Sequence, residues 1–154
     1  LVATKQIDMA WIFNGWQGIQ AKQQGIDLNV YMMADHTDCI PDYYTPVLIT
    51  SEAMIAEKPD VVRAFLKAVS HGYQDAIANP DEAADLLLKA VPDMDAALVK
   101  ESQAWVSPRY QADAARWGEQ SLAVWAGYSE WMAHNAIIDK PIDAEAAFTN
   151  EFLP

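Results

Sequence analysis

The chain of 154 residues carries 10 Lys and Arg against 22 Asp and Glu, so its formal net charge is −12. This charge disfavours nucleic acid and anionic membrane surfaces as partners, because both are bound through clustered Lys and Arg. Apolar residues make up 52% of the chain, which is too many for intrinsic disorder. No apolar run reaches the roughly 20 residues of a membrane-spanning helix. The composition therefore indicates an acidic, globular binder of a small molecule or a protein.

The beginning of the chain is typical of a helix that is already under way. Residues Leu1 to Gln6 contain neither a positively charged start nor an apolar stretch of signal-peptide type. We therefore expect a fragment of a longer chain, with any signal peptide upstream. The single cysteine, Cys39, cannot form an internal disulfide.

Three short apolar runs have the length of β-strands. They cover residues 8–13, 28–33 and 43–50. A short helix is expected from Trp16 to Gln24, because Gly25 follows at the usual position just past a helix end. A strand, a helix and a second strand in this order predict a parallel α/β sheet. The third run contains Pro46, which cannot donate to a strand ladder, so it is expected at a sheet edge or crossing between lobes.

After residue 50 the pattern becomes helical. Ser51 is suited to cap a short turn, and Pro59 is suited to the first position of a helix whose apolar residues recur every three or four positions. Helical stretches are expected over residues 51–56, 59–77, 80–91, 95–105 and 117–134, with one short turn within 142–154. The predicted fold class is α/β, with few strands on the N-terminal side and a mainly helical C-terminal part.

Asn14, Trp16 and Gln17 directly follow the first predicted strand. In an open α/β sheet, ligands bind in the crevice beyond the carboxyl ends of the strands. Two amides and an indole face at that place could stack on a small heterocycle and hydrogen-bond to it. The alternative is a turn whose Asn-Gly sets the geometry and whose Trp packs inward.

Asp42, Tyr43 and Tyr44 stand at the entry to the third predicted strand. Neighbouring side chains of a strand point to opposite faces, so at most one of the two tyrosines should face a given cleft. The alternative is one core tyrosine and one surface tyrosine.

The remaining polar residues give no signature of catalysis or metal binding. His36, Asp38 and Cys39 share a polar loop but lack metal-ligand spacing, so no metal site is expected. The chain has no serine elbow and no Gly-rich phosphate loop, and no cofactor is expected. The helical tryptophans are interpreted as core residues: Trp105, Trp117, Trp125 and Trp131. The residues alone thus favour binding over catalysis.

Six segments of the chain, the first two being Asp8–Gly18 and Ile40–Thr50, follow one another in an order that resembles the NMT1/THI5-like periplasmic-binding family, including its thiamine-pyrimidine-precursor members. Asp8–Gly18 is similar to a strand and ligand loop of the second lobe, and Ile40–Thr50 to the return crossing between lobes. Further similar segments are Pro59–Ala68, Gly72-Tyr73, Ala78–Ala83 and Phe148–Pro154. The resemblance implies a type II substrate-binding fold with a cleft between two lobes, in a chain about twice as long. Residues 1–40 would then be the end of lobe two, and residues 41–154 the return crossing and the C-terminal part of lobe one.

The same resemblance implies a function and a site. Bacterial members deliver ligands to an ABC importer, so the expected partners are a small aminopyrimidine-like molecule and the importer's membrane subunit, in the periplasm or on a lipid anchor outside the cell. Asn14, Trp16 and Gln17 match the ligand loop, where pyrimidine-binding members often carry Glu in place of Gln17. Asp42 and Tyr43 match the hinge signature, with Tyr44 beside the cleft.

Two alternatives stay open at this stage. A fungal branch of the same fold is an enzyme that makes the thiamine pyrimidine from pyridoxal phosphate. A stand-alone helical interaction domain could instead use its acidic surface to recruit a basic partner. A severed half of a binding protein would expose an apolar sheet face and edge, and would therefore self-associate.

Overall fold

The structure is a computed structural model that describes residues 6–154. The helix end expected at residues 1–6 lies outside the described residues, apart from Gln6. The chain forms two compact units. Unit 1 consists of Leu1–Val30 and Gly72–Asp113, and unit 2 of Tyr31–His71 and Ala114–Pro154. The predicted assignment of residues 1–40 and 41–154 to two lobes concerns a longer protein and stays a prediction.

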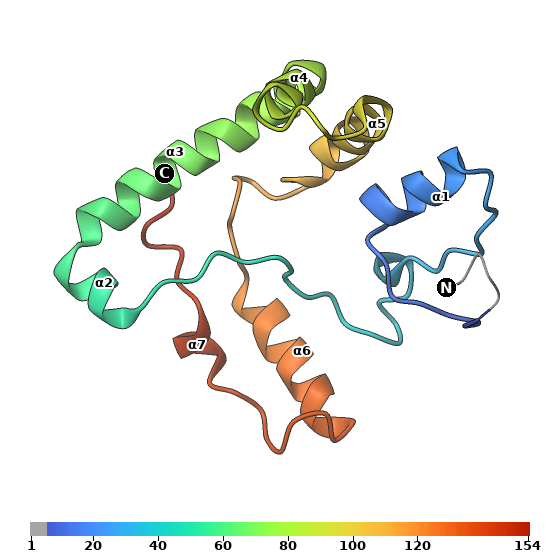
Figure 1. The fold of residues 1–154 in the computed structure, drawn as a ribbon. Helices are drawn as coiled ribbons and strands as arrows, with labels where there is room; N and C mark the ends of the chain where they lie inside the picture. Colours follow the sequence, from blue (N-terminus) through green and yellow to red (C-terminus); the bar gives the residue numbers. More distant parts are fainter. Residues whose placement is uncertain (1–5) are drawn as a thin grey trace. The chain divides into compact units, whose positions relative to one another are not determined.

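The described residues form helices joined by turns and extended segments (Figure 1). They are the π-helix η1 (Asn14–Gly18), α1 (Ile19–Gln23), the 3-10 helix η2 (Met33–Asp35), α2 (Glu52–Glu57), α3 (Pro59–Ala78), α4 (Pro80–Ala90), α5 (Ala96–Val106), the 3-10 helix η3 (Ser107–Arg109), α6 (Leu122–His134) and α7 (Ala144–Ala147). Side-chain caps start several of them. Ser51 accepts the Met54 N–H at 3.1 Å, and Asp95 accepts the Leu98 N–H at 2.9 Å.

The prediction of an α/β fold was wrong, because residues 6–154 contain no β-strand. A strand exists only where its N–H and C=O groups bond to a neighbouring strand, and the runs 8–13, 28–33 and 43–50 have no such partner among the described residues. Their apolar side chains stay largely exposed: Met9 retains 89% of its accessible surface and Ile49 retains 90%. Apolar composition alone therefore did not make these runs strands.

The helix predictions are confirmed after residue 50, with one correction. The predicted helix over 117–134 begins five residues later, at Leu122. Gly118 adopts a positive φ of 81°, a left-handed conformation that a right-handed helix cannot contain. The first predicted helix, Trp16 to Gln24, differs in the opposite sense, since it starts earlier than expected, as η1 at Asn14.

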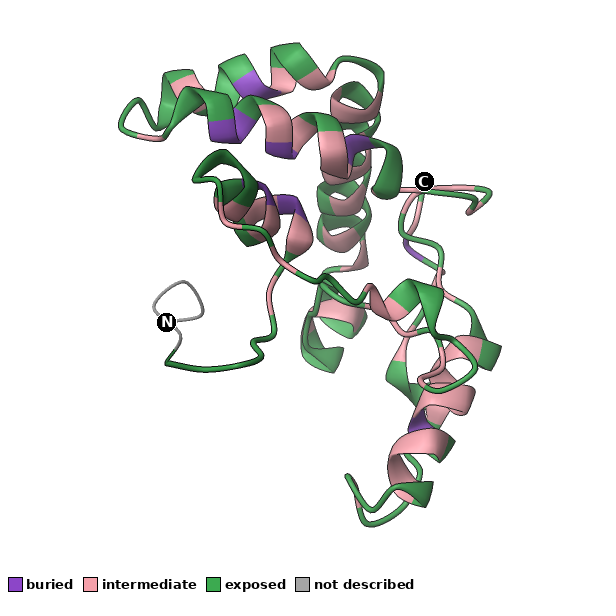
Figure 2. Ribbon diagram, turned by 90° about the vertical axis from the view of Figure 1, so that its right-hand side faces the viewer, coloured by how far each residue is buried: buried purple, intermediate pink, exposed green. Residues whose placement is uncertain are grey.

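Unit 1 is built around α5, which packs against α4, η1 and α1. Figure 2 shows buried positions where these helices face one another. The buried apolar side chains are Ile19, Ala84, Leu98 and Val99. Gly15 of η1 is also buried, and its backbone lies directly against the Trp105 ring and Val106 of α5. This close approach leaves no room for a side chain at position 15.

A carboxylate ties α1 to α5 within unit 1. Glu101 accepts hydrogen bonds from the Gln23 amide at 2.8 Å and from the Lys22 ammonium at 3.0 Å. These two donors, Gln23 first and Lys22 second, lower the pKa of Glu101 below its usual range.

Unit 2 joins α6, α7 and the C-terminal tail, and its part of α3 receives the last residues of the chain. Arg63 donates to the Glu151 carbonyl oxygen, and to the Glu151 carboxylate at 2.7 Å. The guanidinium carbon also lies 4.6 Å from the centre of the Phe152 ring, a cation–π arrangement. Phe152 is 5% exposed, so this contact fixes the tail.

No helix within residues 6–154 is both long and apolar enough to cross a bilayer.

Gly15→Ala is expected to destabilise the protein by about 1–3 kcal/mol, the usual cost of overpacking. A Cβ at this position would lie 2.7 Å from Trp105 Cε3 and 2.8 Å from Val106 Cγ1. The matched control is Gly72→Ala in α3, where no described atom would meet the new Cβ within 4 Å. That control should gain about 0.5–1 kcal/mol, because Ala is favoured over Gly inside a helix. Urea unfolding measures both changes, and equal stability of Gly15→Ala and wild type would contradict the packing described here.

Gln23→Ala is expected to raise the pKa of Glu101, and by more than Lys22→Ala does, because the Gln23 hydrogen bond is the larger cause of the lowered value. Since the folded-state pKa is lowered, Glu101 stabilises the fold above the usual pKa of Glu, and this contribution is lost as the pH falls through the folded-state pKa. Titration of the Glu101 carboxyl carbon by NMR measures the shift. Gln24→Ala is the neighbouring control and should leave this pKa unchanged; no change in Gln23→Ala would refute the assignment.

Candidate ligand-binding site

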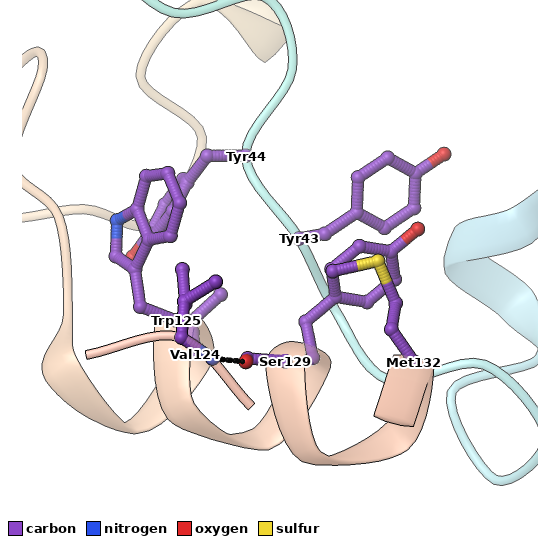
Figure 3. Close-up of a pocket in the computed structure, with 8 residues that line it drawn as sticks. Tyr43, Tyr44, Val124, Trp125, Ser129 and Met132 are labelled. Carbon is purple, nitrogen blue, oxygen red and sulfur yellow. Dashed lines mark hydrogen bonds between the residues drawn. The ribbon is translucent and has the colours of Figure 1, made fainter. Parts of the chain in front are cut away.

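Unit 2 contains a pocket between α6 and the extended segment that carries Tyr43 and Tyr44. The cavity volume is about 130 Å³. Its lining consists of Tyr43, Tyr44, Val124, Trp125, Tyr128, Ser129, Met132 and Ile142. In Figure 3, Tyr44 and Trp125 stand on one side of the hollow and Tyr43 on the other, above Met132. The lining is mostly aromatic and apolar, as is usual for pockets that bind small organic molecules.

Two groups of stacked rings form the walls of this pocket. The rings of Tyr43 and Tyr128 are 4.8 Å apart at an angle of 20°, and Trp131 continues this stack 5.7 Å from Tyr128. On the other side Trp125 stacks on Phe148 at 6.1 Å and 6°, and lies 6.3 Å from Tyr44. Offset aromatic pairs at these distances are each worth about 0.5–1.5 kcal/mol beyond burial. The walls are thus built from flat aromatic rings.

Hydrogen bonds fix the orientation of the Trp125 wall. The indole Nε1 of Trp125 donates to Gln120 Oε1 at 2.7 Å. Asn150 of the tail holds the Gln120 backbone in turn, accepting its N–H at 3.0 Å and donating to its carbonyl at 2.7 Å. The Tyr44 hydroxyl accepts the backbone N–H of Ser121 at 2.7 Å. These bonds anchor the rings to the loop that precedes α6.

The Tyr43 hydroxyl lies in a different environment. Partial burial raises the pKa of the Tyr43 phenol, and the neighbouring Tyr128 and Asp42 raise it further. Tyr43 therefore remains protonated at neutral pH and can donate a hydrogen bond. Asp42 lies next to the pocket, where its carboxylate accepts the backbone N–H of Tyr43 at 2.9 Å.

The structure brings only part of the predicted site together. Tyr43 and Tyr44 line the same pocket, so the expectation that at most one would face a given cleft was wrong. The reason is that residues 43–50 are not a strand, and the strict alternation of faces does not apply. Asn14, Trp16 and Gln17 belong to η1 in unit 1.

The η1 residues have local contacts of their own. The Gln17 side chain accepts the backbone N–H of Phe13 at 3.0 Å, which closes the start of this helix. Trp16 is half-buried and Gln17 is exposed. The role of Asn14, Trp16 and Gln17 in ligand binding stays a prediction.

Sequence reasoning missed the five pocket residues on α6: Val124, Trp125, Tyr128, Ser129 and Met132. Trp125 was interpreted as a core residue, and Trp125, Tyr128 and Met132 are only half-buried. The sequence signal that could have identified them is a helix with aromatic residues at positions 125, 128 and 131 around the small Ser129. It indicates a concave aromatic surface as much as a core.

Within residues 6–154, no three His, Cys, Asp or Glu side chains are grouped so that they could hold a metal ion. His36, Asp38 and Cys39, which share one loop, are all exposed.

Comparison with known proteins identifies several relatives. The chain is 33% identical over 142 residues to a riboflavin-binding protein of Chloroflexus aurantiacus, a match that covers 88% of this chain and 39% of that protein. It is 28% identical over 133 residues to a formylaminopyrimidine-binding protein of Halalkalibacterium halodurans, covering 84% and 40% of the two chains. A 4-amino-5-hydroxymethyl-2-methylpyrimidine phosphate synthase of Legionella pneumophila is 26% identical over 98 residues, covering 64% and 30%.

The chain spans about two fifths of the length of the first two of these relatives. Residues 1–83, more than half of the chain, match the family described as NMT1/THI5 like. This match agrees with the segments Asp8–Gly18 and Ile40–Thr50, which resemble that family. The chain belongs to the NMT1/THI5-like family.

Proposed function

We propose that this chain is part of the substrate-binding component of an ABC importer for a small, flat nitrogen heterocycle, a thiamine pyrimidine precursor or a related compound. The protein would act outside the cytoplasmic membrane, in the periplasm or on a lipid anchor, and deliver its ligand to the importer's membrane subunit. Hinge closure around the bound ring would retain the ligand until delivery.

The aromatic pocket of unit 2 is the observation that carries this proposal. Two of the relatives are named as binding proteins for planar heterocycles, one for riboflavin and one for formylaminopyrimidine. Rings of this kind stack on Tyr and Trp faces such as those of Tyr43 and Trp125. The cavity of about 130 Å³ is close to the roughly 150 Å³ that holds a benzene molecule in an engineered protein core. One six-membered ring of a ligand therefore fits between the walls.

A second candidate is a pyrimidine-synthesising enzyme, which the Legionella relative named as a synthase supports. The family resemblance implies that such an enzyme consumes pyridoxal phosphate. Absorbance of bound pyridoxal phosphate on the full-length protein separates the two candidates. Reversible ligand binding without turnover supports the binding protein, and formation of a pyrimidine product supports the enzyme.

Val124→Phe is expected to weaken binding of riboflavin or of formylaminopyrimidine by at least tenfold, because the added ring occupies the cavity that Val124 lines. The measurement is isothermal titration calorimetry of the full-length protein, with unfolding curves to check that the variant folds. Ala123→Phe is the matched control, since the neighbouring residue on α6 is exposed, and it should bind like wild type. Full affinity in Val124→Phe would place the ligand elsewhere, and failure of the wild type to bind either compound would refute the proposed function.

Trp16→Ala is expected to weaken the same binding by about 1–3 kcal/mol if the indole of η1 contacts the ligand. Trp11→Ala, which removes an exposed indole just before η1, is the control and should leave the affinity unchanged. Calorimetry of both variants measures the difference. An unchanged affinity in Trp16→Ala removes Trp16 from the site and leaves the pocket of unit 2 as the ligand-contacting surface.

A further inference from the structure

Two consecutive residues that do not line the pocket hold two of its rings. Gln120 accepts the indole N–H of Trp125 with its side-chain oxygen at 2.7 Å. The backbone N–H of Ser121 donates to the Tyr44 hydroxyl at 2.7 Å. Trp125 and Tyr44 stand on the same side of the hollow (Figure 3). The orientation of this wall therefore depends on the position of residues 120 and 121, neither of which belongs to the lining.

The side chain of Asn150 fixes the backbone at Gln120. Its oxygen accepts the Gln120 N–H at 3.0 Å, and its NH₂ group donates to the Gln120 carbonyl oxygen at 2.7 Å. A side-chain amide carries a donor and an acceptor on one planar group, so it can pair with both backbone groups of a single residue. A leucine of similar size could form neither bond. Asn150 thus determines where the Gln120 side chain starts.

The tail that carries Asn150 is held independently of Gln120. On one side of Asn150, Phe148 stacks on the Trp125 ring at 6.1 Å. On the other side, the Glu151 carboxylate accepts from Arg63 at 2.7 Å, and Phe152 is buried. Loss of the Asn150 amide should therefore release Gln120 without releasing the tail.

The bond to Gln120 also decides how Trp125 can contact a ligand. The indole N–H is already paired, so Trp125 contributes its ring and no hydrogen-bond donor to the pocket. Aromatic stacking depends on the distance and angle between the rings. In a cavity of about 130 Å³, a rotated indole would take up part of the space for a ligand. Ligand affinity should therefore depend on the acceptor at position 120.

We propose that Gln120 and Asn150 are positioning residues for ligand binding. Gln120 orients the Trp125 ring through the indole N–H, and Asn150 acts through the backbone of Gln120. This inference rests on the proposed function, because it assigns the residues that arrange the same pocket.

The first test compares Gln120→Leu with Gln120→Glu in the full-length protein. Gln120→Leu removes the acceptor and should lose roughly three- to tenfold in affinity, the usual effect of one neutral hydrogen bond. Gln120→Glu keeps an acceptor and should restore most of the affinity. Gln24→Leu, the same substitution at an exposed glutamine of unit 1, should bind like wild type. Quenching of flavin fluorescence measures riboflavin binding, and calorimetry measures formylaminopyrimidine binding if riboflavin does not bind to the wild type.

A spectroscopic signature separates positioning from general destabilisation. The NMR resonance of the Trp125 indole N–H is identified by its absence in Trp125→Phe. It should move upfield in Gln120→Leu, because the proton loses its acceptor, and remain downfield in Gln120→Glu. Urea unfolding of the same variants checks that each one folds.

A double-mutant cycle tests the role of Asn150. Asn150→Leu should weaken binding on its own, and it should weaken binding less in the Gln120→Leu background, because the route through Trp125 is already lost there. Strictly additive losses would show that Asn150 acts by another route, and would overturn its assignment as a residue that acts through Gln120.

Two further results overturn the inference and leave the proposed function intact. One is unchanged affinity in Gln120→Leu, and the other is an equal loss in Gln120→Leu and Gln120→Glu. Failure of the wild-type protein to bind either riboflavin or formylaminopyrimidine overturns the inference together with the proposed function.

Discussion

The indole of Trp125 is held at its polar edge and on its ring face, and the pocket of unit 2 depends on that constraint. Gln120 accepts the indole N–H at 2.7 Å, while Phe148 stacks on the ring at 6.1 Å. Both partners belong to the segments that bracket α6, the preceding loop and the C-terminal tail. These contacts restrict the rotation of the Trp125 side chain and pair its indole N–H. Trp125 therefore keeps the cavity open, because filling the space would require it to break these contacts.

The helical half of the chain could be predicted, and the physical reason is the local origin of the signal. Pro59 and the apolar spacing that follows it define α3 by residues a few positions apart, and the structure has α3 at Pro59–Ala78. The predicted strand 43–50 failed because a strand depends on a remote partner that its own sequence does not contain. The predicted start of a helix at residue 117 was wrong, because Gly118 adopts a left-handed conformation. A right-handed helix cannot contain such a residue, even where the surrounding pattern favours a helix.

The candidate site was predictable to a smaller extent. Tyr43 and Tyr44 were named because they stand at the entry to the third predicted strand, beside the hinge signature of the family that the chain resembles. Trp125 was assigned to the core, because a helix face that lines a pocket and a helix face that packs on a neighbour have the same periodicity. The pocket that this face forms with Tyr43, Tyr44 and Ile142 shows which of these two roles the face has.

Two consecutive residues of the tail bind to two different elements of unit 2, and this arrangement has a mechanical consequence. Asn150 is bonded to Gln120 ahead of α6, and Glu151 is bonded to Arg63 on α3. One residue step spans only about 3.8 Å between Cα atoms and cannot stretch, so it acts as a short, stiff tether. A displacement of α3 along its axis would pull on the loop that contains Gln120. Through this loop it would strain the hydrogen bond between Gln120 and the Trp125 indole. The emission of Trp125 would thus report strain that originates on a helix outside the pocket lining.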